Sequence, residues 1–198
     1  MTAPDQTDLF GSEEPPPTPV SDGGRQTLFY AQIPPPSACE LISSRGESLR
    51  SCHGLGGKLL AADRMHITLV FLAESIGPMP VATIEAARAA AASVRHRPLD
   101  IVLDQALSFP TSHAFVLSGS ESAAVADFCK VLASPLKRYG LKPRPAGTPH
   151  LTLLYDRQHQ VEAHPIDPIR WTAASFSLVL SHVGKTLHDH LGAWPLRA

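Results

Sequence analysis

One short pattern, a histidine followed two residues later by a threonine, occurs twice in the chain, in His66-Ile67-Thr68-Leu69 and in His150-Leu151-Thr152-Leu153. Each copy lies in a short apolar run that is typical of a β-strand. Side chains alternate between the two faces of a strand, so each copy places an imidazole and a hydroxyl on one face and two aliphatic side chains on the other. The duplication therefore predicts two strands that bury their aliphatic faces and bring two histidines and two threonines to one cleft.

Chance is a poor explanation for the presence of two copies of the motif in one chain. Common residues are each used at roughly 5–10%, so one match is unsurprising in a chain with 10 histidines. Two matches in strand-like runs are expected on the order of once in a thousand such chains. Either histidine alone could be an ordinary residue at a strand edge, because intermediate burial is common for histidine. The pair favours a shared site.

The segments around the two motifs repeat an order of elements. In the first half, apolar periodicity and prolines predict a strand at 28–33, a helix from prolines 34–36 to about residue 50, the first motif, an Ala-rich helix at about 80–95 and a strand at 99–107. In the second half they predict a strand at 113–117, a helix over 121–139 that stops at Gly140, the second motif and a strand at 174–183. The Ala-rich helix has no counterpart after the second motif.

This repetition predicts an α+β fold of two lobes related by a pseudo-twofold axis, each lobe a mainly antiparallel sheet with packed helices. The two His-x-Thr strands are expected to face each other across a central cleft. Residues 1–25 are rich in proline, glycine and acidic side chains, which predicts a disordered tail. Residues 26–198 then form a single bilobal domain, with lobe one at about 26–110, lobe two at about 111–198 and a junction near 108–112.

Charge, hydropathy and cysteine usage argue against several classes of protein. The net charge of −1 does not suit a non-specific nucleic-acid binder, and no run approaches the ~20 apolar residues of a membrane span. Cys39, Cys52 and Cys129 lack C-x-x-C spacing, so neither a disulfide framework nor a structural zinc site is expected. The chain starts without a signal-peptide pattern, which favours a cytoplasmic location. Because one chain supplies both motifs, a monomer would suffice.

Two His-x-Thr pairs suit acid–base chemistry on a phosphate group. Histidine has an unperturbed pKa of about 6.5, so near neutral pH one imidazole can be charged while the other is neutral. One can accept a proton from a nucleophile while the other donates a proton to a leaving group. Threonine hydroxyls can donate hydrogen bonds to non-bridging phosphate oxygens. This arrangement fits the opening of a strained cyclic phosphodiester and requires neither a metal nor a cofactor.

With their flanking residues, the motifs resemble the two signature strands of the two-histidine (2H) phosphoesterase superfamily, in Met65-His66-Ile67-Thr68-Leu69-Val70-Phe71-Leu72 and Pro149-His150-Leu151-Thr152-Leu153. Three further segments are similar to the bacterial RNA 2′,3′-cyclic phosphodiesterases, also called 2′-5′ RNA ligases: Leu28-Phe29-Tyr30-Ala31, Ser181-His182-Val183-Gly184 and Trp194-Pro195-Leu196. The likeness runs from about residue 27 to the C-terminus. It implies hydrolysis of a terminal RNA 2′,3′-cyclic phosphate to a 2′-phosphate, with a reversible 2′-5′ joining reaction.

The resemblance also implies roles for individual residues. His66 would protonate the departing 3′ oxygen as general acid, and His150 would activate water as general base. Thr68 and Thr152 would hold the phosphate. Tyr30 would stack on the base, which is a common way to hold an unpaired nucleotide.

One expected residue is missing beside the second motif. Many relatives carry an arginine there that helps to hold the phosphate, at the place where this chain has Tyr155. Arg157 is shifted by two residues, and Lys185 in the Gly184-Lys185-Thr186 turn is another cation that could reach the site. Surface cations are often merely solvated, so both remain expectations.

Alternative functions stay open at this point. His182, His188 and His190 raise the alternative of a metal-dependent hydrolase, although their spacing matches no H-E-x-x-H or similar ligand pattern and a threonine two residues after each motif histidine suits phosphate better than a metal. A second alternative is a module that binds RNA ends or a nucleotide without turnover. A third is a phosphodiesterase that acts on other small cyclic nucleotides or on 2′-5′ oligonucleotides.

The tail carries a separate short motif. Gln6-Thr7-Asp8-Leu9-Phe10 resembles the peptide through which bacterial proteins dock on the DNA sliding clamp, in which Leu9 and Phe10 would fill an apolar pocket and Gln6 would fix the register. Matches of five residues are frequent by chance. A linear peptide in an acidic tail can nevertheless serve as a binding segment.

Overall fold

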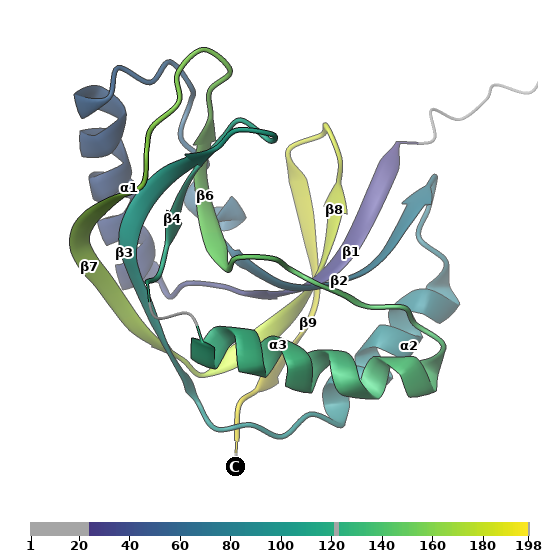
Figure 1. The fold of residues 1–198 in the computed structure, drawn as a ribbon. Coiled ribbons are helices and arrows are strands. Elements are labelled where there is room, and N and C mark those ends of the chain that lie inside the picture. The colour runs from purple at the N-terminus through teal and green to yellow at the C-terminus, as the bar shows by residue number, and fades with distance from the viewer. Residues whose placement is uncertain (1–23, 121–122, 198) are drawn as a thin grey trace, which may run out of the picture.

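The computed structural model describes residues 24–120 and 123–197, so the proposed sliding-clamp motif at Gln6, Leu9 and Phe10 lies outside the described residues. Within these ranges the chain forms an antiparallel sheet with α-helices packed against it (Figure 1). The strand order is β7-β3-β4-β6-β2-β1-β8-β9, and the short β5 pairs with β2. The predicted α+β class is confirmed.

The strands are β1 (Arg25–Gln32), β2 (Ile67–Ile76), β3 (Leu99–Phe109), β4 (Ala114–Ser118), β5 (Arg144–Pro145), β6 (His150–Tyr155), β7 (His164–Ala173), β8 (Ser175–His182) and β9 (Leu187–Pro195). The helices are α1 (Pro36–Cys52), α2 (Val81–Ala92) and α3 (Ala123–Leu136), with 3-10 turns η1 (Ala62–Arg64) and η2 (Lys137–Tyr139). All helices that the sequence predicted are present.

Local residues explain where these helices begin and end. Proline occupies the first position of α1, where its missing N–H and fixed φ are favourable. Helix α3 continues into η2 and stops at Gly140, whose φ of 76° lies in the left-handed region that glycine adopts without strain. The turn residues named from the sequence therefore set the helix boundaries.

Strands β7 and β9 were not predicted, and both lie at the edges of the sheet. Pro165 and Pro168 lie within β7, and proline is tolerated in a strand mainly at an edge because it lacks an N–H donor. No residue of strand β9 is fully buried, so its apolar pattern is weak. At the other end of the chain, β1 begins at Arg25, inside the segment that was predicted to be a disordered tail.

The sheet has two halves, but these do not correspond to the two halves of the chain. Strands β1, β2, β8 and β9 form one half, and β3, β4, β6 and β7 form the other. The predicted division near residue 110 is therefore wrong as a lobe boundary. Residues 110–113 form a tight turn between β3 and β4, which pair from Gln105↔Ser118 to Phe109↔Ala114. Each half of the sheet takes strands from both halves of the chain.

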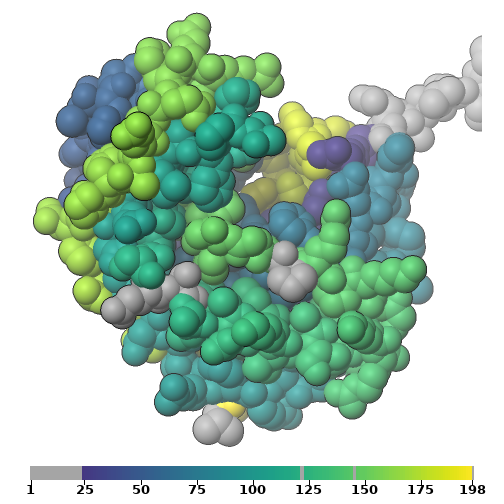
Figure 2. Space-filling view, viewed as in Figure 1, coloured from purple at the N-terminus to yellow at the C-terminus, as the bar shows by residue number. Residues whose placement is uncertain are grey.

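The helices cover the outer faces of the sheet and leave a hollow between its halves. Helix α1 packs against β7, whereas α2 and α3 pack against each other and against β9 and β2. The Tyr30 hydroxyl of β1 donates to the Ala87 carbonyl of α2, and Phe128 of α3 contacts Phe176 of β8 edge-to-face. Figure 2 shows the hollow between the yellow β8–β9 hairpin and the teal β3–β4 strands. In the described part of the chain, no helix is both long and apolar enough to cross a bilayer.

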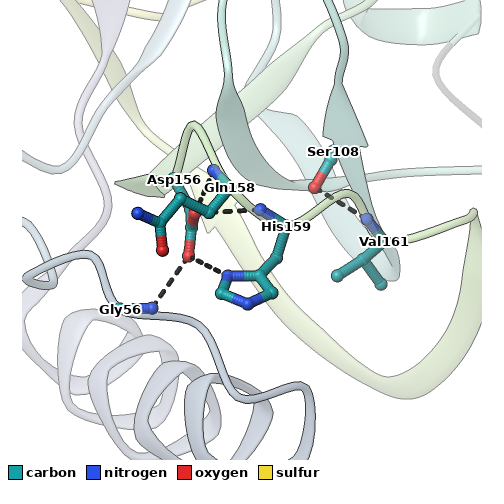
Figure 3. A network of polar contacts seen from close by, with 6 residues as sticks. All are labelled: Gly56, Ser108, Asp156, Gln158, His159 and Val161. Atoms are coloured by element: carbon teal, nitrogen blue, oxygen red, sulfur yellow. Dashed lines mark hydrogen bonds and ion pairs between the residues drawn. The ribbon is translucent and has the colours of Figure 1, made fainter.

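A buried carboxylate fixes the loop after β6 (Figure 3). Asp156 accepts hydrogen bonds from the backbone N–H groups of Gln158 and Gly56 and from the His159 ring. These donors hold the pKa of Asp156 well below its usual range. The contact with Gly56 ties the end of β6 to the loop after α1, and β6 carries the second His-x-Thr motif.

Candidate active site

The two His-x-Thr motifs meet at one point in the middle of the sheet. The residue pair that joins β2 to β6 is Ile67↔Leu151, and both side chains are buried in the core. Because the strands are antiparallel, His66 lies on the side of Thr152, and Thr68 lies on the side of His150. The Ile67–Leu151 pair is thus the centre of a local twofold that exchanges the two motifs.

The four polar side chains of the motifs face one cavity of about 530 Å³, as strand alternation predicts. His66, Thr68, His150 and Thr152 line it and are all partly buried. Its other polar side chains come mainly from the β8–β9 hairpin. No aspartate or glutamate is among the described residues that line this cavity. The site is therefore suited to an anion.

Both catalytic candidates are held in the same ring orientation. The Nδ1 of His66 lies 2.8 Å from the Arg64 carbonyl oxygen, and the Nδ1 of His150 lies 2.7 Å from the Thr148 carbonyl oxygen. A carbonyl can only accept, so each Nδ1 carries the hydrogen and donates it. Each Nε2 is left to exchange a proton in the cavity, as acid–base chemistry requires.

The environment of His66 disfavours its charged form. Burial lowers the pKa of His66 to about 4. The hydrogen bond to the Arg64 carbonyl opposes this shift, while the neighbouring imidazoles of His188 and His150 add to it. The ring of Phe29 also covers His66, with centroids 5.1 Å apart. A negatively charged ligand in the cavity would favour the imidazolium form again.

Among the described residues, the cation that lines this cavity is Arg64, which the sequence analysis missed. The two proposed cations, Arg157 and Lys185, are exposed and do not line the cavity, so their predicted role in phosphate binding is not supported. Arg157 lies in the turn after β6, and Lys185 lies at the tip of the β8–β9 hairpin. Arg64 ends the 3-10 turn η1, outside strand β2, so the alternation of the His-x-Thr strand does not extend to it.

Tyr30 does not stack on a ligand. Its side chain is fully buried, its hydroxyl donates to the Ala87 carbonyl at 2.6 Å, and its ring packs edge-on against Phe176. The neighbouring Phe29 points to the opposite face of β1 and lines the cavity instead. The sequence does not show which of these two aromatic residues faces the cavity, because Leu28 to Ala31 are all buried and show no alternation.

Two exposed aromatic side chains stand at the cavity and were not predicted as site residues. Phe71 on β2 is 36% exposed and Tyr155 on β6 is 55% exposed, and both line the cavity. Aromatic side chains that remain half-exposed beside a polar cavity are suited to stacking on a nucleobase. Tyr155, which occupies the place of the expected arginine, therefore faces the site with a ring rather than a charge.

The three histidines near the C-terminus do not form one cluster. His182 donates from Nε2 to Asp189 at 2.7 Å, and its Nδ1 lies 3.2 Å from the Gln26 side chain. His188 lies against His66 inside the cavity, whereas His190 is exposed and outside it. Among residues 24–120 and 123–197, no group of three or more His, Cys, Asp or Glu is arranged to hold a metal ion.

Comparisons with known proteins place the chain in a family. A model of the 2′-5′ RNA ligase superfamily matches residues 34–185. No curated protein matches the sequence significantly. Among solved structures, E. coli LigT complexed with 3′-AMP is 25% identical, with a TM-score of 0.70 over 88% of this chain and 99% of that chain.

Two further solved structures support the same fold. A crystal structure of a phosphoesterase is 26% identical, with a TM-score of 0.69 over 87% of this chain and 99% of that chain. The protein TT0787 of Thermus thermophilus, at 19% identity, shares the fold with a TM-score of 0.67 over 87% of this chain and 98% of that chain. The chain therefore belongs to the 2′-5′ RNA ligase superfamily of two-histidine phosphoesterases.

Proposed function

We propose that this protein hydrolyses the 2′,3′-cyclic phosphate at the end of an RNA to a 2′-phosphate, with His66 as general acid and His150 as general base. The observation that carries the proposal is the local twofold at Ile67–Leu151, which presents two Nε2 atoms and two threonine hydroxyls to one cavity. A cyclic phosphodiester needs a base on the attacking side and an acid on the leaving side. The two histidines related by the local twofold supply the base and the acid.

The reaction needs two proton transfers. His150 takes a proton from water at its Nε2 as the water oxygen bonds to phosphorus. The bond from phosphorus to O3′ breaks, and O3′ takes the proton from Nε2 of His66. Thr68 and Thr152 donate to the non-bridging oxygens, where negative charge increases in the transition state. If a ribose 5′-hydroxyl replaces water, the same steps form a 2′-5′ linkage.

The low pKa of His66 is compatible with its role as acid, because the substrate itself is an anion. A phosphodiester beside the imidazole stabilises the charged form and raises the pKa from about 4 in the free protein. His66 is then protonated when substrate binds and becomes neutral when O3′ takes its proton in the reaction. Phe71 and Tyr155 would replace the predicted Tyr30 as stacking surfaces for the base.

The test is turnover of an oligoribonucleotide that ends in a 2′,3′-cyclic phosphate, with the product identified as 2′- or 3′-phosphate. We expect a 2′-phosphate and full activity in the presence of a chelator. His66→Ala and His150→Ala should each lower kcat by about 10²–10⁴-fold. His190→Ala, which removes an exposed histidine outside the cavity, is the matched control and should retain activity.

Three outcomes would contradict the proposal. A 3′-phosphate product would reverse the assignment of the leaving oxygen. Loss of activity on chelation would favour the metal-dependent hydrolase. Tight binding of the cyclic end without any turnover would favour a binding module, because that function needs no proton transfer.

A further inference from the structure

Arg64 and His188 form a second group of nitrogen donors beside His66, here named the Arg64–His188 corner. Both residues line the cavity. The rings of His66 and His188 meet edge-on with centroids 5.2 Å apart. Arg64 ends η1, and His188 lies on the edge strand β9. The corner is therefore assembled from segments far apart in the sequence.

The described residues offer the Arg64 guanidinium few hydrogen-bond acceptors and no ion pair. Its Nε is buried and has no hydrogen-bond partner among the described residues. No ion pair to Arg64 is found in this part of the chain. Of the nearby acids, Asp189 is paired with His182, and Asp63 acts on His188 only through its charge. A buried donor without a partner is costly unless a ligand supplies the acceptor.

The local twofold separates this corner from the catalytic pair. The axis at Ile67–Leu151 exchanges His66 with His150, and it relates Arg64 to the uncharged Thr148. The catalytic histidines and threonines are thus matched across the axis, but the extra positive charge lies on the His66 side alone. A single anion bound equally by His66 and His150 does not require an extra positive charge on one side only. The corner fits a second anion next to the first.

We propose that the Arg64–His188 corner binds a second phosphate, the one attached to the 5′ oxygen of the nucleotide whose cyclic phosphate is opened. The proposal rests on the function proposed above. In an RNA this phosphate links the terminal nucleotide to the rest of the strand, and in a free nucleotide it is a 5′-monophosphate. Both offer the same non-bridging oxygens to the planar guanidinium fork. The corner makes the protein select nucleotides that carry a 5′ phosphate.

Binding measurements test the corner without turnover. The probes are adenosine 3′,5′-bisphosphate and 3′-AMP, measured by calorimetry on the full chain. We expect the bisphosphate to bind about tenfold more tightly, as one charge-assisted hydrogen bond supplies. In Arg64→Gln the two probes should bind with equal affinity, and Arg64→Lys should retain part of the preference for the bisphosphate. Lys185→Gln, which removes an exposed cation outside the cavity, is the matched control and should keep the wild-type ratio.

Turnover assays then distinguish the source of the phosphate. The substrates are adenosine 2′,3′-cyclic phosphate, its 5′-phosphorylated form and a diadenylate that ends in a cyclic phosphate. A higher kcat/KM for both phosphorylated substrates, lost in Arg64→Gln, supports the corner, and the better of the two identifies the source. Equal binding of the two probes by the wild type, or an unchanged ratio in Arg64→Gln, overturns it. Failure to turn over any substrate refutes the proposed function alone, because the binding ratio still tests the corner.

Discussion

Replacing His66 with asparagine should make the folded protein lose less unfolding free energy when the pH falls. Burial lowers the pKa of His66 to about 4, against about 6.5 in an unfolded chain. Between these values the unfolded chain binds more protons than the folded one, so stability rises with pH and is fully present above about pH 6.5. The amide nitrogen of asparagine can still donate to the Arg64 carbonyl but does not titrate.

The size of the effect follows from the two pKa values. From pH 7 to pH 5, His66 alone should cost the wild type about 2 kcal/mol of unfolding free energy. The assay is urea unfolding of wild type and His66→Asn at both pH values. The wild type should lose about 2 kcal/mol more than the variant over this interval. His190→Asn controls for the loss of an exposed imidazole and should follow the wild type.

NMR titration of the imidazoles checks the same reasoning directly. The resonance that is absent in His66→Asn should titrate near pH 4 in the free protein and at higher pH when inorganic phosphate is added. Equal loss of stability in wild type and His66→Asn, with a free-protein titration near 6.5, would refute the argument. The burial of His66 would then not control its charge.

Three further changes test separate parts of the structure. Tyr30→Phe removes the hydroxyl bound to Ala87 and should cost about 1 kcal/mol in urea unfolding with kcat unchanged; a large fall in kcat would return Tyr30 to the site. Gly57→Ala places a Cβ against the Tyr155 carbonyl and should cost about 1–3 kcal/mol; unaltered stability would contradict this packing. Phe71→Ala should raise KM about tenfold through lost base stacking while kcat stays near wild type, and an unchanged KM would exclude stacking there.

What could be predicted from the sequence was local. The alternation in each His-x-Thr strand placed the imidazole beside the hydroxyl, and Gly140 marked the end of a helix. The pairing of β3 could not be predicted, because Leu99–Phe109 has the same alternation whichever half of the sheet it joins. Arg64 was missed for a different reason, since its role depends on a cavity wall supplied by β9.

The exchange of strands between the two halves of the sheet has a consequence for folding. Strand β3 completes the half that holds His150, and β8 and β9 complete the half that holds His66. Neither fragment made by cutting the chain at residue 110 contains a full half-sheet, so neither should fold alone. Pairings this distant in sequence slow folding, because long segments of chain must close before the strands pair. Both histidines should therefore acquire their native environment only after these long-range strand pairs have formed.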